Sequence, residues 1–139
     1  MKAKKVETGY FIRLDKGEEV IKTLTDFIAQ EKIPAGVITG IGALTDIELG
    51  YFERGQKQYI KRRFEDVYEL LSLTGNISYS NGNPTIHAHC ILGDADYQLI
   101  GGHFFSGTVA VTGEIYVRAF KEQFKREPNP EFELKLLAF

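Results

Sequence analysis

Residues 85–103 read TIHAHCILGDADYQLIGGH and hold all three histidines of this 139-residue chain. The first half of the stretch is rich in residues typical of strands, and side chains along a strand alternate between its two faces. His87 and His89 therefore leave the same face, with Cα atoms roughly 6.5 to 7 Å apart. The residues Asp94-Ala-Asp96 indicate a turn, after which His103 can return on an adjacent strand. The stretch predicts two neighbouring strands that carry three histidines.

Three imidazoles that converge on one point can bind a metal ion. Neutral imidazole suits zinc and some other divalent transition metals. We expect His87, His89 and His103 to bind one such ion, with zinc as the first choice. Three protein ligands leave a fourth position for water or a small ligand. The alternative is that the histidines are structural residues, which form hydrogen bonds or a polar contact between subunits.

Cys90 is a further candidate, because thiolate is a soft zinc ligand. On a regular strand its side chain faces away from both neighbouring histidines, so we expect it to be buried as a small hydrophobic residue. Only a β-bulge would turn it toward them.

Four acidic residues could assist such a site as partners of an imidazole or of a bound water. Asp94 and Asp96 fit a solvated turn better than this role. Glu69 and Glu114 lie in strand-like segments, where an exposed sheet face is the expected position for a carboxylate. A position next to the metal, as a base, is the alternative for these two glutamates.

The remaining sequence predicts strands and one helix. Apolar residues recur at helical spacing from Val20 to Ile28. Asp15 with Glu18 is a candidate N-terminal cap, and Pro34 favours a helix end near residue 31 or 32. Alternation and β-type composition predict strands at residues 10–14, 36–44, 47–52, 58–61, 67–74, 85–92, 97–103, 108–119 and 132–137, a turn at 81–84 and a charged connection at 120–126.

Two other sequence patterns are candidates for a nucleotide or nucleic-acid binding site. Gly40-Ile-Gly42 lacks the third glycine and the βαβ context of a dinucleotide site, so close packing of strands is expected there. The aromatic residues Tyr51, Phe52, Tyr59, Phe64 and Tyr68 could stack on bases, but no basic surface accompanies them. We expect them to pack in the core or at a subunit contact.

Composition limits the classes of protein that remain. With 43% hydrophobic residues, residues 1–139 are expected to form a single domain. A net charge of -2 gives no electrostatic reason to expect nucleic acid. No apolar stretch is long enough for a signal peptide or a membrane span. A single cysteine excludes an internal disulfide and fits a cytoplasmic protein.

Four short motifs in order show a family resemblance. They are GIGAL at 40–44, YELLSLTG at 68–75, HAH at 87–89 and GGHFFSG at 101–107. From about Tyr10 to Phe120 the chain resembles the PPC domain, the plants and prokaryotes conserved domain. Plant members of that family sit beside AT-hook peptides in nuclear proteins, whereas prokaryotic members stand alone.

The resemblance implies an α+β fold with a largely antiparallel sheet, a packed helix and assembly as a homotrimer. In some prokaryotic members a metal is bound by three histidines, which correspond here to His87, His89 and His103. The chain has no AT-hook of the Arg-Gly-Arg-Pro type, so minor-groove binding does not carry over from the plant proteins.

Two functions follow from these observations. The first is a metal site open to water or a small molecule, which would support metal-assisted hydrolysis or hydration with an acid as proton acceptor. The alternative is a DNA-associated regulatory or interaction module whose metal is structural. An acid beside the metal would favour the first function, and a continuous basic face would favour the second.

Overall fold

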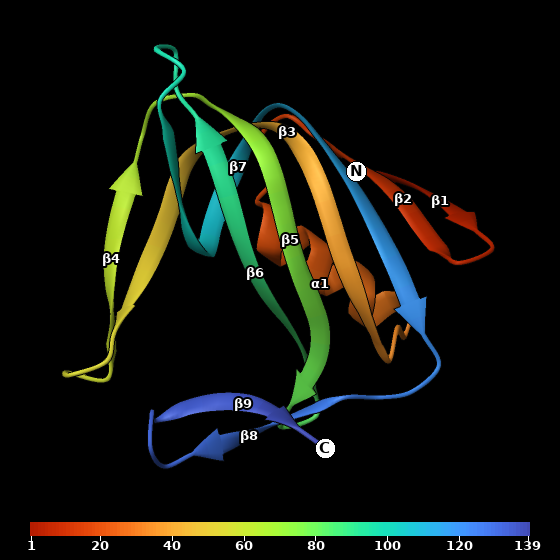
Figure 1. The fold of residues 1–139 in the computed structure, drawn as a ribbon. Helices are drawn as coiled ribbons and strands as arrows, with labels where there is room; N and C mark the ends of the chain where they lie inside the picture. Colours follow the sequence, from red (N-terminus) through yellow and green to blue (C-terminus); the bar gives the residue numbers. More distant parts are fainter.

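A curved nine-stranded sheet with one helix against it makes up the computed structural model, which describes residues 1–139 (Figure 1). All its ladders are antiparallel except a single parallel pairing between β5 and β8. The elements are β1 (Lys2–Val6), β2 (Gly9–Asp15), α1 (Val20–Gln30), β3 (Ala35–Glu53), β4 (Gln58–Phe64), β5 (Tyr68–Ser80), β6 (Asn83–Gly93), β7 (Leu99–Phe120), β8 (Lys125–Asn129) and β9 (Leu134–Ala138).

Four of these strands close into a ring. β3 pairs with β5, β5 with β6, β6 with β7, and β7 returns to β3. β7 can pair with both β6 and β3 because its first residues form one ladder and its later residues form the other. This closure brings β6 and the start of β7 side by side, as the histidine stretch predicted.

Helix α1 packs on one face of the sheet, behind the strands in Figure 1, and contacts β6 and β7. Its buried side chains Val20, Leu24, Phe27 and Ile28 lie at the predicted helical spacing. The predicted cap at Asp15 was wrong: the Glu19 carboxylate accepts from the Lys22 backbone N–H, so the helix begins at Val20. At 11 residues, the one helix is too short to cross a membrane.

The core lies between α1 and the sheet. Twenty-two buried residues form one hydrophobic cluster, including Leu14, Leu24, Ile38, Leu73 and Leu92. Burial alternates along β2 from Tyr10 to Leu14, as expected for a strand with one covered face. The opposite face has no helix over it and exposes apolar side chains such as Phe11, Ile41 and Leu71.

Two pairs of predicted strands are single long strands in the structure. Residues 36–44 and 47–52 both belong to β3, and residues 97–103 and 108–119 fall almost entirely within β7. Irregular register, rather than a turn, connects the parts of β3 between Thr45 and Glu48. A Cβ at Gly40 would lie 2.3 Å from Cδ1 of Ile115, so the structure bears out close strand packing at the Gly40-Ile-Gly42 pattern.

The turn predicted at residues 81–84 is a two-residue hairpin loop between β5 and β6. Ser80 pairs with Asn83, and the loop residues Asn81 and Gly82 have φ values of 52° and 80°. Both central residues of a type I′ turn need positive φ, which Asn and Gly tolerate best. The charged connection predicted at 120–126 was wrong at its end, where Lys125 already begins β8.

Candidate metal centre

The three histidines lie on the face of the sheet that α1 leaves uncovered. On β6, His87 and His89 are separated by buried Ala88, so they leave the face opposite to the core. His103 on β7 is the direct partner of His89 in the β6–β7 ladder. Strand alternation and ladder register thus bring together all three residues that the sequence singled out.

The geometry of the three rings fits the ligand set of one metal ion. Nε2 of His87 and Nε2 of His89 are 3.2 Å apart, and one ring nitrogen from each histidine lies within 4.8 Å of the others. Ligand nitrogens around tetrahedral zinc are about 3.3 Å apart when each lies about 2.05 Å from the ion. The ring nitrogens of His87 and His89 already have that spacing.

Burial keeps two of the imidazoles neutral. His87 and His103 are half-buried, whereas His89 is exposed. Burial, with smaller contributions from His87, His89, Arg126 and Lys61, lowers the pKa of His103 to about 4. Burial also lowers the pKa of His87, with Arg126 and His89 acting in the same direction. Neutral imidazole is the form that binds metal ions, so both residues are in the required state at pH 7.

Two aromatic side chains form a wall beside His103. The ring centroids of Tyr59 and Phe105 lie 4.7 and 4.5 Å from that of His103. Gly50, the β3 partner of His103, makes room for both: a Cβ there would lie 2.4 Å from Phe105 and 2.9 Å from Tyr59. The wall depends on the absence of a side chain at this position.

Tyr59 also supplies a polar contact to His103. Its hydroxyl lies 3.4 Å from Nδ1 of His103, and burial raises the pKa of Tyr59, which keeps the phenol protonated. In the tautomer that leaves Nε2 free for a metal, Nδ1–H donates to the Tyr59 oxygen. A long hydrogen bond of this kind orients the ring for ligation. From the sequence we expected Tyr59 to pack in the core or at a subunit contact, and no local pattern indicates its contact with His103.

A second residue that sequence reasoning missed is Arg126 on β8. Its Nε donates to Oγ of Ser78 at 2.8 Å, and its Nη2 donates to Oδ1 of Asn76 at 2.7 Å. Its Nη1 donates to the backbone oxygen of Lys135 at 3.1 Å. Asn76 is the β5 partner of His87, so the guanidinium is held next to the histidines.

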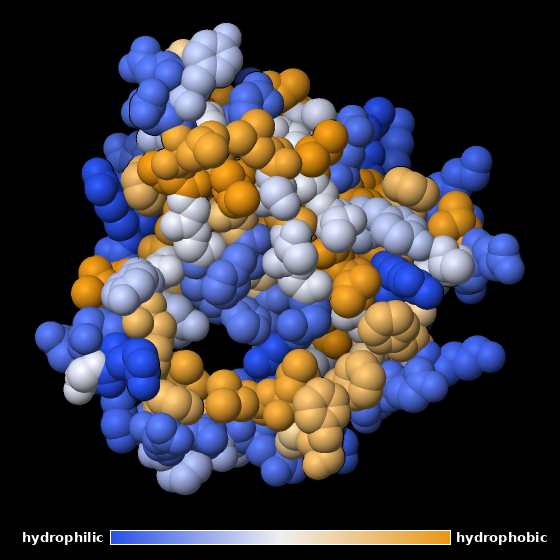
Figure 2. Space-filling view, in the orientation of Figure 1, coloured by the Kyte–Doolittle hydropathy of each residue, from blue (hydrophilic) through white to orange (hydrophobic).

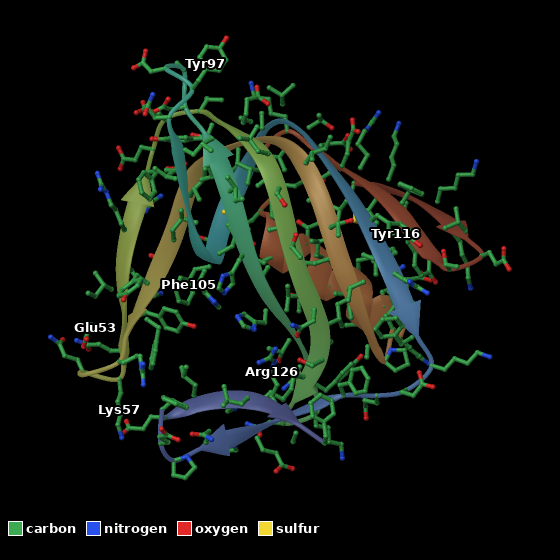
Figure 3. All side chains as sticks on the ribbon, in the orientation of Figure 1. Glu53, Lys57, Tyr97, Phe105, Tyr116 and Arg126 are labelled. Carbon is green, nitrogen blue, oxygen red and sulfur yellow. The ribbon has the colours of Figure 1, made fainter.

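A hollow of about 370 Å³ connects the histidines with the β8–β9 hairpin. Figure 2 shows an opening on this face just above the hairpin, and Figure 3 shows Arg126 between the hairpin and the strands above it. No acidic residue lines the hollow. Its lining consists of Tyr59, Ser80, Thr85, Ile86, His87, His103, Arg126, Leu134, Lys135 and Leu136.

The other candidates from the sequence lie away from this hollow. Cys90 is 3% exposed in the core, as predicted, and burial raises its pKa to about 12. Asp94 closes the predicted turn, where its carboxylate accepts from the backbone N–H groups of Asp96 and Gln98. Glu69 and Glu114 are exposed, as expected, and they line a different pocket of the same sheet face.

Residues 1–121 match the family model of the Plants and Prokaryotes Conserved (PCC) domain, also written PPC. The chain belongs to this family. The resemblance inferred from the four short motifs is thereby confirmed, and the matched region begins earlier than the motifs indicated.

Three solved structures resemble this PCC-domain chain over almost its whole length. A candidate DNA-binding protein from Bacteroides thetaiotaomicron is 32% identical, with a TM-score of 0.96 and coverage of 99% of this chain and 96% of that one. A PPC protein from Pyrococcus horikoshii is 34% identical, with a TM-score of 0.88 and coverage of 94% and 90%. A metal-containing protein from Archaeoglobus fulgidus is 30% identical, with a TM-score of 0.87 and full coverage of both chains.

A curated relative is much longer than this chain. The bifunctional protein GlmU of Synechococcus sp. is 27% identical over 124 residues, which are 87% of this chain but only 18% of that protein. The similarity therefore concerns one segment of the larger protein.

Proposed function

We propose that this PCC-domain protein binds one divalent transition metal ion through His87, His89 and His103. The convergence of three ring nitrogens within 4.8 Å is the observation that carries the proposal. The metal-containing relative from Archaeoglobus fulgidus supports it. Zinc is the first choice because three histidines with an open fourth position form a well-known type of zinc site.

The site is open to water or a small molecule. No other histidine, cysteine or acidic side chain joins the three histidines in a metal-binding group, and Cys90 faces the core. A zinc ion in such a site supplies a polarised water at neutral pH, which suits hydrolysis or hydration of a small molecule. Tyr59 orients His103, and the hollow beside His87 and His103 provides space for the molecule.

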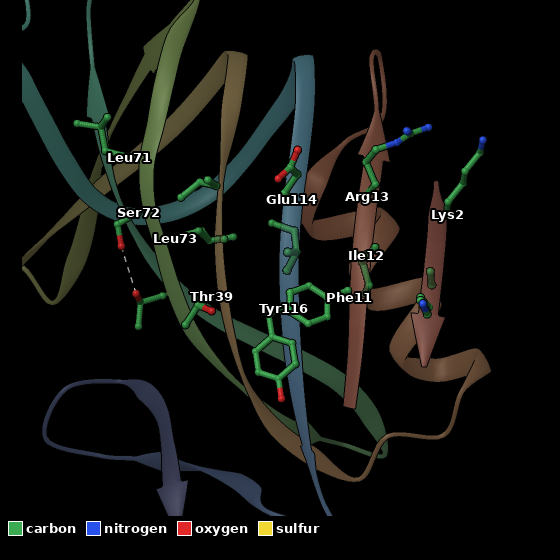
Figure 4. Close-up of a pocket in the computed structure, with 16 residues that line it drawn as sticks. Lys2, Phe11, Ile12, Arg13, Thr39, Leu71, Ser72, Leu73, Glu114 and Tyr116 are labelled. Atoms are coloured by element: carbon green, nitrogen blue, oxygen red, sulfur yellow. Dashed lines mark hydrogen bonds between the residues drawn. The ribbon is translucent and has the colours of Figure 1, made fainter. Parts of the chain in front are cut away.

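We also propose that the protein is a homotrimer that assembles through the apolar part of the uncovered sheet face, which contains none of the three histidines. Directly paired residues form a row across this face, in the order Phe11, Tyr116, Thr39, Thr74, His89 and His103. Phe11 and Tyr116 stack with centroids 4.9 Å apart beside a pocket of about 690 Å³ (Figure 4). Exposed apolar side chains border this pocket, among them Ile41 and Leu71. Such a patch is typical of a protein contact, and further copies of the chain are its proposed occupants.

The alternative function is a DNA-associated module in which the metal is structural. The similarity to a candidate DNA-binding protein favours it. The net charge of -2 and the apolar character of the uncovered face count against it, because DNA binding depends on basic surfaces. We therefore rank it second. In either case we propose that residues 1–139 act as one domain in the cytoplasm.

Cobalt substitution tests the open metal site. Co²⁺ in place of zinc gives visible absorption that reports ligand number, and added azide should shift the spectrum if a ligand position is exchangeable. Binding of one Co²⁺ per chain with an azide-sensitive spectrum is the expected result. A spectrum that does not respond to azide would favour a closed, structural metal. Failure to take up cobalt would contradict the site itself.

A further inference from the structure

Arg126 is a half-buried cation without an anionic partner. Its three hydrogen bonds end on the neutral oxygens of Ser78, Asn76 and the Lys135 backbone. The ion pairs of the chain join other residues, and none includes Arg126. Burying a charge is costly unless an opposite charge compensates it. The position therefore needs a reason beyond holding the β8–β9 hairpin.

The guanidinium keeps donors for a ligand. Arginine has five N–H donors, and the three contacts use one on Nε, one on Nη1 and one on Nη2. One N–H remains on each terminal nitrogen. Because the three contacts fix the plane of the group, these two donors are held in place before any ligand arrives. A fixed guanidinium is well suited to a planar carboxylate.

The surroundings of Arg126 favour a small anion with an apolar body. The hollow next to it contains a second cation, Lys135, and no carboxylate. Leu134 and Leu136 of β9 and Ile86 of β6 supply apolar surface on its walls. The volume of about 370 Å³ is at the small end of the range for ligand pockets. His87 and His103 line the same space.

We propose that the hollow binds a short-chain carboxylate, with its carboxylate group on Arg126 and its other end directed toward the histidine centre. The second part of this inference, that the other end of the ligand lies at the histidine centre, rests on the proposed metal site. The contact between the carboxylate and Arg126 does not require the metal. The two parts can therefore fail separately in an experiment.

Calorimetric titration of the zinc-loaded protein with butyrate tests the proposal. Butyramide serves as the neutral analogue, and inorganic phosphate serves as the anion without an apolar body. We expect butyrate to bind, butyramide not to bind measurably, and phosphate to bind more weakly than butyrate. Arg126→Gln should weaken butyrate at least about tenfold, the effect of losing a charge-assisted contact. Equal affinity of wild type and Arg126→Gln for butyrate would overturn the proposal.

Arg54→Gln is the matched control, because it removes the same group from the exposed loop between β3 and β4. Its butyrate affinity should stay within about twofold of wild type. Arg126→Lys keeps the charge but loses the paired N–H donors of the guanidinium. It should give an intermediate affinity for butyrate. If Arg126→Gln does not fold, Lys135→Gln replaces it, with an expected loss of about threefold in butyrate affinity. An unchanged affinity in Lys135→Gln would then contradict a cationic hollow.

Zinc affinity, measured separately by chelator competition, distinguishes the two proposals. Arg126→Gln should bind zinc within about threefold of wild type, because Arg126 is not a ligand. If the wild type takes up no zinc, the metal proposal fails. The zinc-free protein is then titrated with butyrate, and the NMR signal of the Arg126 Nε–H is monitored. This titration tests the carboxylate site alone. A shift of that signal supports the anion site, and no shift overturns it.

Discussion

His89 on β6 and His103 on β7 face each other as direct partners in the antiparallel ladder that joins these strands. The ladder continues regularly to the pair Gly93 and Leu99, so backbone hydrogen bonds set the relative position of the two imidazoles. His87 lies two residues before His89, so strand alternation places its side chain on the same face of β6. All three histidines lie on paired strands rather than in a loop, so the site is preorganised by the sheet.

Loss of one histidine should abolish tight metal binding, whereas loss of the adjacent cysteine should not. His89→Ala removes a ligand, so its zinc affinity should fall by more than about 100-fold, the upper range for residues that only support ligands. Cys90→Ala should leave zinc affinity unchanged and lower the free energy of unfolding by about 1 to 2 kcal/mol. Chelator competition and urea unfolding measure the two effects. Equal losses of affinity in both variants would contradict the assigned orientation of Cys90.

The Cys90 thiol should be unreactive in the folded protein. Burial raises its pKa to about 12, so the reactive thiolate is almost absent at pH 8. Ellman's reagent should modify the native protein very slowly and the urea-unfolded protein at once. Complete modification of native protein within seconds would show that Cys90 is accessible. Such a result would reopen its role as a ligand.

A side chain at Gly50 should disturb the aromatic wall. The Cβ of Gly50→Ala would lie 2.4 Å from Phe105 and 2.9 Å from Tyr59, so both rings must move. We expect a loss of about 1 to 3 kcal/mol in the free energy of unfolding, a change in tyrosine fluorescence and weaker zinc binding. Gly55→Ala, in the loop after β3 with only the Glu53 side chain nearby, is the control. Gly50→Ala with wild-type stability and zinc affinity would contradict the role of this glycine.

The metal-free protein should lose stability as the pH falls from 6.5 toward 4. The pKa of His103 is about 4 in the folded protein, below its ordinary value of 6.5. The unfolded chain therefore binds more protons than the folded chain in this window, and stability rises with pH across it. Urea midpoints at pH 5 and pH 7 should differ less in His103→Gln than in wild type. An identical pH dependence in both proteins would contradict the lowered pKa.

Charge placed on the uncovered sheet face should break the assembly. Ile41 is 56% exposed in the single chain, so Ile41→Lys removes little core packing but sets a cation on the proposed contact. Light scattering of wild type should give three times the chain mass of 15.7 kDa, and the variant should approach one chain mass. Lys57→Glu, on the exposed loop after β3, is the control. A monomeric wild type at all concentrations would refute the trimer.

Much of this fold follows from local patterns in the sequence. Alternation along residues 10–14 and 85–92 identified β2 and β6, and apolar spacing identified α1. The lengths of β3 and β7 were harder to predict from the sequence, because an irregular register inside a strand resembles a break between two strands. Asp46 has a φ of 51°, a value common in turns, yet β3 continues through it. Ladder pairs before it, at Thr45 and Thr108, and after it, at Ile47 and Phe64, keep the strand continuous.

Two strands escaped prediction because they bury few side chains. β1 contains three lysines and is almost fully exposed, and its backbone pairs with β2 along its whole length. β8 includes Pro128, a residue that normally argues against a strand. In such edge strands, backbone pairing determines whether the strand forms, and amino-acid composition predicts it poorly.

The histidines of the candidate site could be read from the sequence, but their surroundings could not. His87 and His89 are close in sequence, and His103 is one strand connection away. Arg126 reaches the site only because β8 pairs with β5 in parallel at Tyr79 and Lys125. Tyr59 arrives from β4 through its pairing with β3. Both placements depend on long-range topology, which local patterns do not encode.

Elemental analysis of the protein, purified under mild conditions without chelators, tests the central claim most directly. Three histidines supply one site, so the analysis should find about one divalent transition ion per chain, and His89→Ala prepared in parallel should contain much less. A wild-type protein that is purified without metal, and that takes up no zinc on addition, would contradict a metal centre at His87, His89 and His103.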